Sequence, residues 1–197
     1  MAEERKLYGL VLAGGQSRRM GRDKALLQRD GRTQLHLAVE LLQGVTEQQF
    51  VSTRAQQQDD AERQRFAQIV DRYDDIGPIA GILSALETHP EVDWLVLACD
   101  LPNLDRQTLD HLIAHAAVEK PFTAFRSSHD GLPEPLCAIF RAHSAAIIRA
   151  FVEGGLVCPR KILIRSDTML LQQPNPAALD NVNTPDDLAS SILHAAQ

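Results

Sequence analysis

The sequence predicts one α/β domain in which helices cover both faces of a mostly parallel sheet, a three-layer α/β/α fold. Short apolar runs alternate along the chain with amphipathic helical repeats, the order expected of successive βα units. The clearest runs are almost entirely apolar, as in strands that are buried on both faces. No linker or second core interrupts the 197 residues, so we expect a single domain over 1–197.

The first part of the chain predicts three strands and two helices. The first strand, 7–13, is a continuous apolar run that stops at a glycine pair. A helix follows, with Thr33 as its candidate N-cap, because one helical face is apolar at Leu35, Ala38, Val39 and Leu42. Two further strands are expected at 48–53 and 68–71, with a short helix over 61–68 between them.

The remaining elements continue the alternation. After Pro78, a helix is predicted by the apolar positions Ile79, Ile82, Leu83 and Leu86. The strongest strand, 93–100, ends at Asp100, and Asp105 is the candidate cap of a helix that is apolar at Leu109, Leu112, Ile113 and Ala116. Two strands are then expected at 121–126 and 135–141, interpreted as antiparallel neighbours. They are followed by a helix at 147–151, a strand at 168–172 and a last helix that starts from a cap at Thr184.

Composition excludes several broad functions. A formal net charge of −6 argues against general binding to nucleic acid or to anionic membranes. The three cysteines, Cys99, Cys137 and Cys158, form no CxxC pair, which is typical of a reducing compartment. The N-terminal stretch has no signal-peptide core, and no apolar run approaches the ~20 residues of a membrane helix. We therefore expect a cytoplasmic protein.

The stretch after the first strand indicates an anion site. Gly14 and Gly15 follow the strand directly, where glycine backbone can approach a ligand closely and present its N–H groups. Four cations come next, and together they favour a polyphosphate: Arg18, Arg19, Arg22 and Lys24. In a parallel sheet the ligand crevice lies at this end of the strands. The alternative is a basic surface loop. The spacing matches neither a Walker loop nor a dinucleotide fingerprint.

Asp100 is the candidate metal ligand, because a charge at the end of an apolar strand is costly unless it is paired, hydrogen-bonded or bound to metal. Mg²⁺ prefers carboxylate and phosphate oxygens. The alternative is a cap of the turn at Pro102. The neighbouring Cys99 is interpreted as a core thiol, because alternation along the strand would point it to the opposite face.

Five segments resemble one family of nucleotidyltransferases, which includes molybdenum cofactor guanylyltransferase. They are LAGGQSRRMGRDK (12–24), DDIGPIAGILSAL (74–86), LACDLP (97–102), EPLCAIF (134–140) and NVNTPDDL (181–188), and they keep the family's order. The Leu-Ala-Gly-Gly start and the Asn-x-Asn-Thr-Pro end point to the guanylyl branch. The resemblance implies a Rossmann-like nucleotidyltransferase fold and Mg²⁺-dependent transfer of GMP from GTP to the terminal phosphate of molybdopterin, with release of pyrophosphate.

The resemblance also implies roles for individual residues. Backbone of Leu12, Ala13 and Gly14 would contact guanine and ribose, Gly15 and Arg19 would line the phosphates, and Lys24 would contact the α-phosphate or the leaving pyrophosphate. Arg19, Lys24 and Asp100 are the implied catalytic residues, with Asp100 on the metal. Further nucleotide or product contacts are implied for Asp71, with Asp74 and Asp75 as competitors, and for Asn181 and Asn183.

Two departures from the family pattern leave questions open. The family asparagine at the end of the second strand is replaced by Ser52 or Thr53. The segment 154–163 lacks the expected arginines, although Arg160 and Lys161 remain candidates for the pterin phosphate.

Other activities stay open at this stage. They are transfer of a cytidylyl group, transfer to a sugar phosphate, and a nucleotide-binding regulatory domain without turnover. The resemblance further implies transient contact with the molybdenum insertion protein or with molybdoenzyme chaperones.

Overall fold

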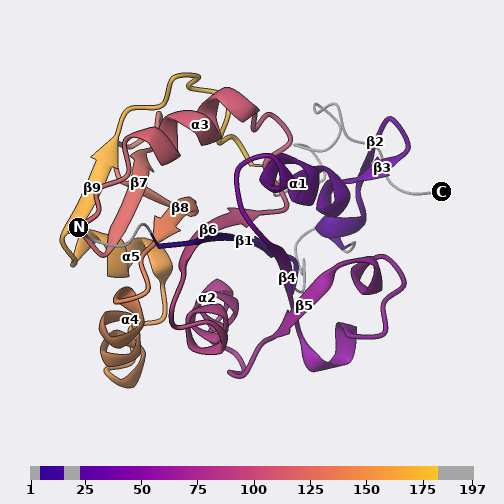
Figure 1. Cartoon of the computed structure of the whole chain (residues 1–197), viewed down its shortest axis with the longest axis horizontal. Coiled ribbons are helices and arrows are strands. Elements are labelled where there is room, and N and C mark those ends of the chain that lie inside the picture. The colour runs from indigo at the N-terminus through magenta and orange to yellow at the C-terminus, as the bar shows by residue number, and fades with distance from the viewer. Residues whose placement is uncertain (1–4, 16–22, 182–197) are drawn as a thin grey trace.

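The computed structural model describes residues 5–15 and 23–181 (Figure 1). In this part of the chain the main sheet has seven strands: β1 (Leu7–Leu12), β4 (Gln49–Thr53), β5 (Ala67–Val70), β6 (Asp93–Ala98), β7 (Phe122–Arg126), β8 (Pro133–Phe140) and β9 (Thr168–Leu171). Their order across the sheet is β5-β4-β1-β6-β8-β7-β9. A small antiparallel ladder, β2 (Gln28–Arg29) with β3 (Arg32–Thr33), stands apart.

The sheet is mostly parallel, as predicted. β1 pairs in parallel with β4 and β6, and β4 pairs in parallel with β5. β8 runs antiparallel to both of its neighbours, β6 and β7, while β7 is parallel to β9. The chain moves outward from β1 to β4 and β5 and then returns to β6 on the other side of β1, so the strand order reverses at β1. In such sheets ligands bind at the carboxyl ends of the strands beside this reversal.

Helices cover both faces of the sheet and complete three layers. The described α-helices are α1 (Gln34–Gln43), α2 (Pro78–Thr88), α3 (Arg106–Ala114), α4 (Ser144–Glu153) and α5 (Pro159–Ile164). Figure 1 shows α1 and α3 on one side of the sheet and α2, α4 and α5 on the other. Each side has its own buried apolar cluster, one built with residues of α2, α4 and α5 and the other with residues of α1 and α3.

Two predicted helix caps are confirmed. The Thr33 hydroxyl accepts a hydrogen bond from the His36 amide at 3.1 Å, and an Asp105 carboxylate oxygen accepts one from the Thr108 amide at 2.8 Å. Each side chain satisfies an amide that the first turn of its helix leaves without a backbone partner. The predicted cap at Thr184 lies outside the described residues.

Several predicted boundaries are wrong. The helix expected over 61–68 is only a 3₁₀ turn, η3 (Arg63–Arg65), because β5 already begins at Ala67. The strand expected to reach Asp100 ends at Ala98, so Asp100 lies in the turn that follows β6. Two other 3₁₀ turns, η1 (Lys24–Leu26) and η2 (Ala55–Gln57), and the helix α5 were not predicted. No helix in the described ranges is long and apolar enough to cross a membrane.

Candidate active site at the carboxyl edge of the sheet

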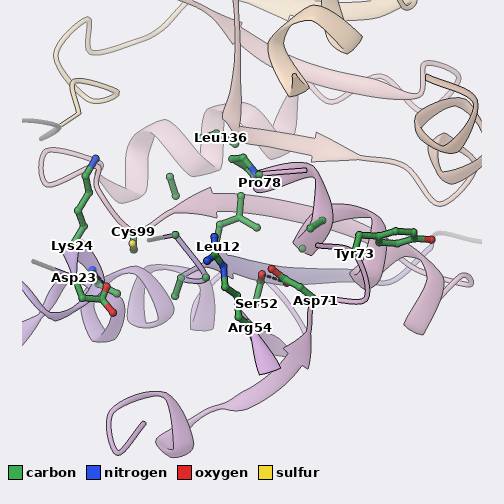
Figure 2. A pocket seen from close by; sticks show the side chains of 18 of the residues that line it. Leu12, Asp23, Lys24, Ser52, Arg54, Asp71, Tyr73, Pro78, Cys99 and Leu136 are labelled. Carbon is green, nitrogen blue, oxygen red and sulfur yellow. Dashed lines mark hydrogen bonds between the residues drawn. The ribbon is translucent and has the colours of Figure 1, made fainter. Parts of the chain in front are cut away.

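A cavity lies at the carboxyl ends of the central strands, where the strand register brings the following segments together. Leu12 at the end of β1 pairs with Ser52 in β4 and with Ala98 in β6, so the segments that follow these strands leave the sheet side by side. Between them lies a cavity of about 680 Å³, a volume typical of small-molecule sites. Figure 2 shows Asp23 and Lys24 on one side of it and Asp71 and Tyr73 on the other, with Leu12, Ser52 and Arg54 between them.

Lys24 and Asp100 form an ion pair across the point where the strand order reverses. The Lys24 Nζ lies 3.0 Å from Asp100 Oδ2, and the two side chains are only 17% and 15% exposed. Asp23 caps η1 by accepting a hydrogen bond from the Ala25 amide at 3.0 Å, which fixes the backbone on both sides of Lys24. The pair therefore joins the turn after β6 to the short helix that follows the predicted anion loop.

Asp100 has an oxygen suited to a metal ion. Its Oδ1 is buried and has no hydrogen-bond partner within the described residues. A buried carboxylate oxygen without a partner is costly, and a cation would satisfy it. The described residues contain no cluster of three or more His, Cys, Asp or Glu side chains able to hold a metal. One carboxylate completed by phosphate oxygens and water is a coordination that Mg²⁺ accepts, so these residues fit that ion.

On the other side of the cavity, Ser52 holds Asp71. The Ser52 hydroxyl donates to Asp71 Oδ1 at 2.7 Å. Burial raises the pKa of the Asp71 carboxyl, while the hydrogen bond from Ser52 and the charge of Arg54 act in the opposite direction. Thr53 is fully buried and donates to Gln68 Oε1 at 3.0 Å, away from the cavity. Of the two candidates for the position of the family asparagine, Ser52 is the one that faces the cavity.

α2 comes close enough to β4 for this arrangement only because residue 81 is glycine. A Cβ atom on Gly81 would lie 2.9 Å from the Ser52 Cβ and closer still to its hydroxyl. It would also lie 3.0 Å from Leu12 Cδ2, at the end of β1. Any larger side chain would push Ser52 away from Asp71.

The structure brings seven of the predicted site residues to the cavity wall: Leu12, Ala13, Gly14, Gly15, Lys24, Asp71 and Asp100. Asp74 and Asp75, the competitors of Asp71, line the same cavity, but only Asp71 directly follows β5 and bonds to Ser52. Asn181 is exposed and does not line this cavity. Arg19 and Asn183, like Arg18 and Arg22, lie outside the described residues.

The candidate pterin residues are arranged differently. Arg160 makes 2.9 Å ion pairs with Asp130 and Glu134, so its guanidinium is held between two carboxylates. Lys161 is exposed. Neither residue lines the cavity at the end of β1.

Cys99, expected to be a core thiol, is half-buried and packs against the apolar cluster of α1 and α3, but the expected geometry is wrong. Burial raises the pKa of its thiol, and the nearby Asp100 and Asp23 carboxylates raise it further, which keeps the sulfur protonated and a poor metal ligand. Because β6 stops at Ala98, strand alternation does not extend to this point, and Cys99 and Asp100 line the same cavity.

Arg63 is a residue of the site's supporting contacts that the sequence did not reveal, since it falls in the segment 61–68, for which only a short helix was expected. Its side chain is 1% exposed and its guanidinium bonds to the Ala13 carbonyl and to the Asp23 and Asp60 carboxylates. The density of acids around it, at 59, 60 and 62, is the only signal in the sequence, and charged residues of both signs are common on solvated helices.

The cavity lies where doubly wound α/β proteins bind nucleotides, at the carboxyl ends of the strands beside the reversal of strand order, so the fold and the site define a protein of that class. A family model, the MobA-like NTP transferase domain, matches residues 9–169, and the chain belongs to that family.

Named relatives agree with this assignment. The chain is 38% identical over 181 residues, or 92% of its length, to a molybdenum cofactor biosynthesis bifunctional protein of Synechocystis sp., but spans only 52% of that protein. It is 33% identical to the molybdenum cofactor guanylyltransferase of Pseudomonas aeruginosa, over 92% of each chain. The solved molybdopterin-guanine dinucleotide biosynthesis protein A of Archaeoglobus fulgidus has the same fold, with a TM-score of 0.77, 24% identity, and coverage of 93% of this chain and 95% of that one.

Proposed function

We propose that this protein transfers GMP from GTP to the terminal phosphate of molybdopterin, releasing pyrophosphate and forming the guanine dinucleotide cofactor. The observation that carries the proposal is the Lys24–Asp100 pair at the strand-order reversal, in a cavity of nucleotide-site size. The name of the Pseudomonas aeruginosa relative supports the choice of substrates.

The charge balance of the cavity supports a requirement for Mg²⁺. The described lining residues include two cations, Lys24 and Arg54, against five carboxylates, which are Asp23, Asp71, Asp74, Asp75 and Asp100. A triphosphate brings more negative charge into this site, so further positive charge is needed to hold it. Asp100 would hold the ion through its unsatisfied Oδ1. When bound, Mg²⁺ supplies charge neutralisation at the phosphates.

The proposed reaction does not require a strong general base from the protein. A phosphate monoester has a second pKa of about 6, so the acceptor is already largely ionised near neutral pH. One of its oxygens forms a bond to the α-phosphorus, the bond from that phosphorus to the α,β-bridging oxygen breaks, and pyrophosphate leaves with the electron pair. None of the described residues lining the cavity is a histidine, in keeping with catalysis by positioning and charge.

Each side of the cavity has a part in this scheme. The backbone of Ala13–Gly15, at the end of β1, approaches the nucleotide, and Lys24 stabilises charge on the α-phosphate or on the leaving pyrophosphate. Beside Gly14, where an added Cβ would lie 3.1 Å from Asp71 Oδ2, the Asp71 carboxylate held by Ser52 accepts hydrogen bonds from the nucleotide.

The test is turnover of purified protein with each nucleoside triphosphate, Mg²⁺ and coupled detection of pyrophosphate, with and without molybdopterin. We expect pyrophosphate only when GTP and molybdopterin are both present. Release from GTP alone would indicate a hydrolase, and release only with CTP would assign the protein to a cytidylyl transferase. Omission of Mg²⁺ should abolish the signal.

The proposal extends to the setting of the reaction. The unpaired cysteines favour the cytoplasm, and the product has to be passed to the enzymes that use it. Contact with the molybdenum insertion protein or with molybdoenzyme chaperones would provide that transfer, an expectation that rests on the family resemblance.

A further inference from the structure

Arg63 is a buried cation whose partners belong to the cavity wall. It lies in η3, on the connection between β4 and β5, and its side chain is 1% exposed. Its Nη2 donates to the Ala13 carbonyl at 2.7 Å and to Asp23 Oδ2 at 2.6 Å, and its Nη1 lies 3.2 Å from Asp60 Oδ1. Burying a guanidinium is costly unless it is paired in this way.

The two bonds from Nη2 join positions that are separated by the predicted anion loop. Ala13 directly follows β1, and Asp23 is the residue on which η1 begins. In the sequence they enclose the glycine pair and the arginines. Ala13 and Asp23 both line the cavity, whereas Arg63 does not, so the guanidinium supports the site from behind. A rigid planar group in this position fixes the spacing between the end of β1 and η1.

The same contacts continue to the reacting groups. Asp23 receives Arg63 on Oδ2 and the Ala25 amide on Oδ1, so both of its oxygens are occupied in fixing the start of η1. Lys24, the first residue of η1, then reaches Asp100 across the strand-order reversal. An unbroken set of short contacts therefore runs from Arg63 through Asp23 and the backbone of η1 to Lys24.

We propose that Arg63 is a positioning residue that holds Lys24 in place for the transition state of nucleotidyl transfer. This inference rests on the proposed function. A group that acts through Lys24 on the transition state should affect kcat more than binding of GTP. If Arg63 contributed only to stability, its substitution would lower the melting temperature without a specific effect on kcat.

The test is a double-mutant cycle of Arg63→Met and Lys24→Ala. We expect Arg63→Met to lower kcat about 10-fold, as for other groups that orient an active residue, with the calorimetric Kd for GTP within about 2-fold of wild type. In the Lys24→Ala background, Arg63→Met should cause no further loss, since the residue it positions is absent. Arg65→Met is the matched control, because Arg65 belongs to the same turn but is 58% exposed and pairs only with Glu62 among the described contacts.

Three results would overturn the role of Arg63: an unchanged kcat in Arg63→Met, equal losses in kcat with and without Lys24, or a Kd for GTP that rises as much as kcat falls. Asp23→Asn tests the same contact if Arg63→Met does not fold, because Asp23 is 27% exposed and Asn keeps the cap. The effect of Arg63 on the position of η1 can also be measured without turnover. The backbone amides of residues 23–27 should exchange hydrogen faster in Arg63→Met than in Arg65→Met. Equal exchange would refute it. A wild-type protein that fails to transfer GMP would instead refute the proposed function.

Discussion

At the scale of single residues, Asp71 is an acid whose burial makes its ionised form costly to the fold. Burial raises its carboxyl pKa above the ordinary value of 3.8, so the folded protein binds this proton more tightly than the unfolded chain does. The stability contribution of Asp71 is therefore lost as the pH rises through the window between 3.8 and the raised pKa. Above that window the ionised carboxylate costs the fold stability, and the nucleotide contact proposed for Asp71 would make use of its charge.

Asp71→Asn should separate these two effects. The amide oxygen can still accept the hydrogen bond from Ser52, and the cost of burying a charge is removed, so the melting temperature at pH 7 should equal or exceed that of wild type. GTP should bind about 10-fold more weakly, because hydrogen bonds to a charged acceptor are stronger. Melting at pH 7 and calorimetry with GTP measure both effects. A lower melting temperature with unchanged GTP binding would contradict this reading of Asp71.

Ser52→Ala provides the complementary pH test. Removing this hydrogen bond takes away an influence that lowers the Asp71 pKa, so the carboxyl should protonate at a higher pH than in wild type. In a plot of GTP affinity against pH, the acid limb should shift to higher pH by the same amount as the Asp71 pKa. An unmoved limb in Ser52→Ala would show that Asp71 is not the group that titrates.

At the scale of the elements, Gly81 is required for packing of α2 against β4, whereas Gly15 borders the cavity. A Cβ on Gly81 would collide with Ser52, whereas one on Gly15, which borders the open cavity, would meet no atom of the described residues within 4 Å. Gly81→Ala should therefore destabilise the fold by about 1–3 kcal/mol through overpacking of α2 against β4. Gly15→Ala should leave the melting temperature unchanged and weaken GTP binding. Equal effects of the two substitutions on melting would contradict this division.

The sequence predicts long elements better than short ones. α1, α2, α3 and the strands of the sheet are recovered because apolar periodicity and the caps at Thr33 and Asp105 reflect burial directly. α5 was missed because the six residues Pro159–Ile164 are too few to display a helical face. The helix predicted over 61–68 is wrong because its second half already belongs to β5, and tertiary contacts that bury Arg63 hold the first half as a 3₁₀ turn.

The site was predictable where a strand end determines position. Gly14, Asp71 and Asp100 each follow a strand closely, and the parallel sheet brings those ends together. The Ser52–Asp71 bond and the Arg63 contacts depend on side-chain geometry between segments that lie 19 to 50 residues apart. No local pattern encodes such pairs.

At the scale of the whole molecule, the ion pairs at the amino ends and at the carboxyl ends of the strands differ in kind. At the amino end of β6, Asp93 is 2% exposed and accepts from Arg141 at 2.7 Å and from the Ala142 amide at 2.8 Å. Both of its carboxylate oxygens are satisfied. At the carboxyl end, Asp100 is paired through one oxygen only, and the other has no described partner. The Asp93 pair is therefore satisfied within the protein, whereas Asp100 has an oxygen available to the proposed Mg²⁺.

Asp93→Asn and Asp100→Asn should therefore behave in opposite ways. Breaking the buried Asp93 pair should cost about 3 kcal/mol, or roughly 10 °C in melting temperature, with kcat of the folded enzyme nearly unchanged. Asp100→Asn should keep the melting temperature within a few degrees and lower kcat about 100-fold, with a higher Mg²⁺ requirement. Rates and melts for both variants across a Mg²⁺ series test this. Wild-type turnover in Asp100→Asn would remove Asp100 from the site.

Transfer of GMP to molybdopterin is tested by following a label from the nucleotide into the products. Purified protein is given molybdopterin, Mg²⁺ and equal concentrations of GTP and CTP, with the α-phosphate of one nucleotide labelled in each reaction and a parallel reaction containing γ-labelled GTP. If the protein transfers GMP to molybdopterin, α-label from GTP appears in the pterin product and γ-label from GTP appears only in pyrophosphate. Transfer of α-label from CTP in preference to GTP, or of γ-label to the pterin, would contradict it.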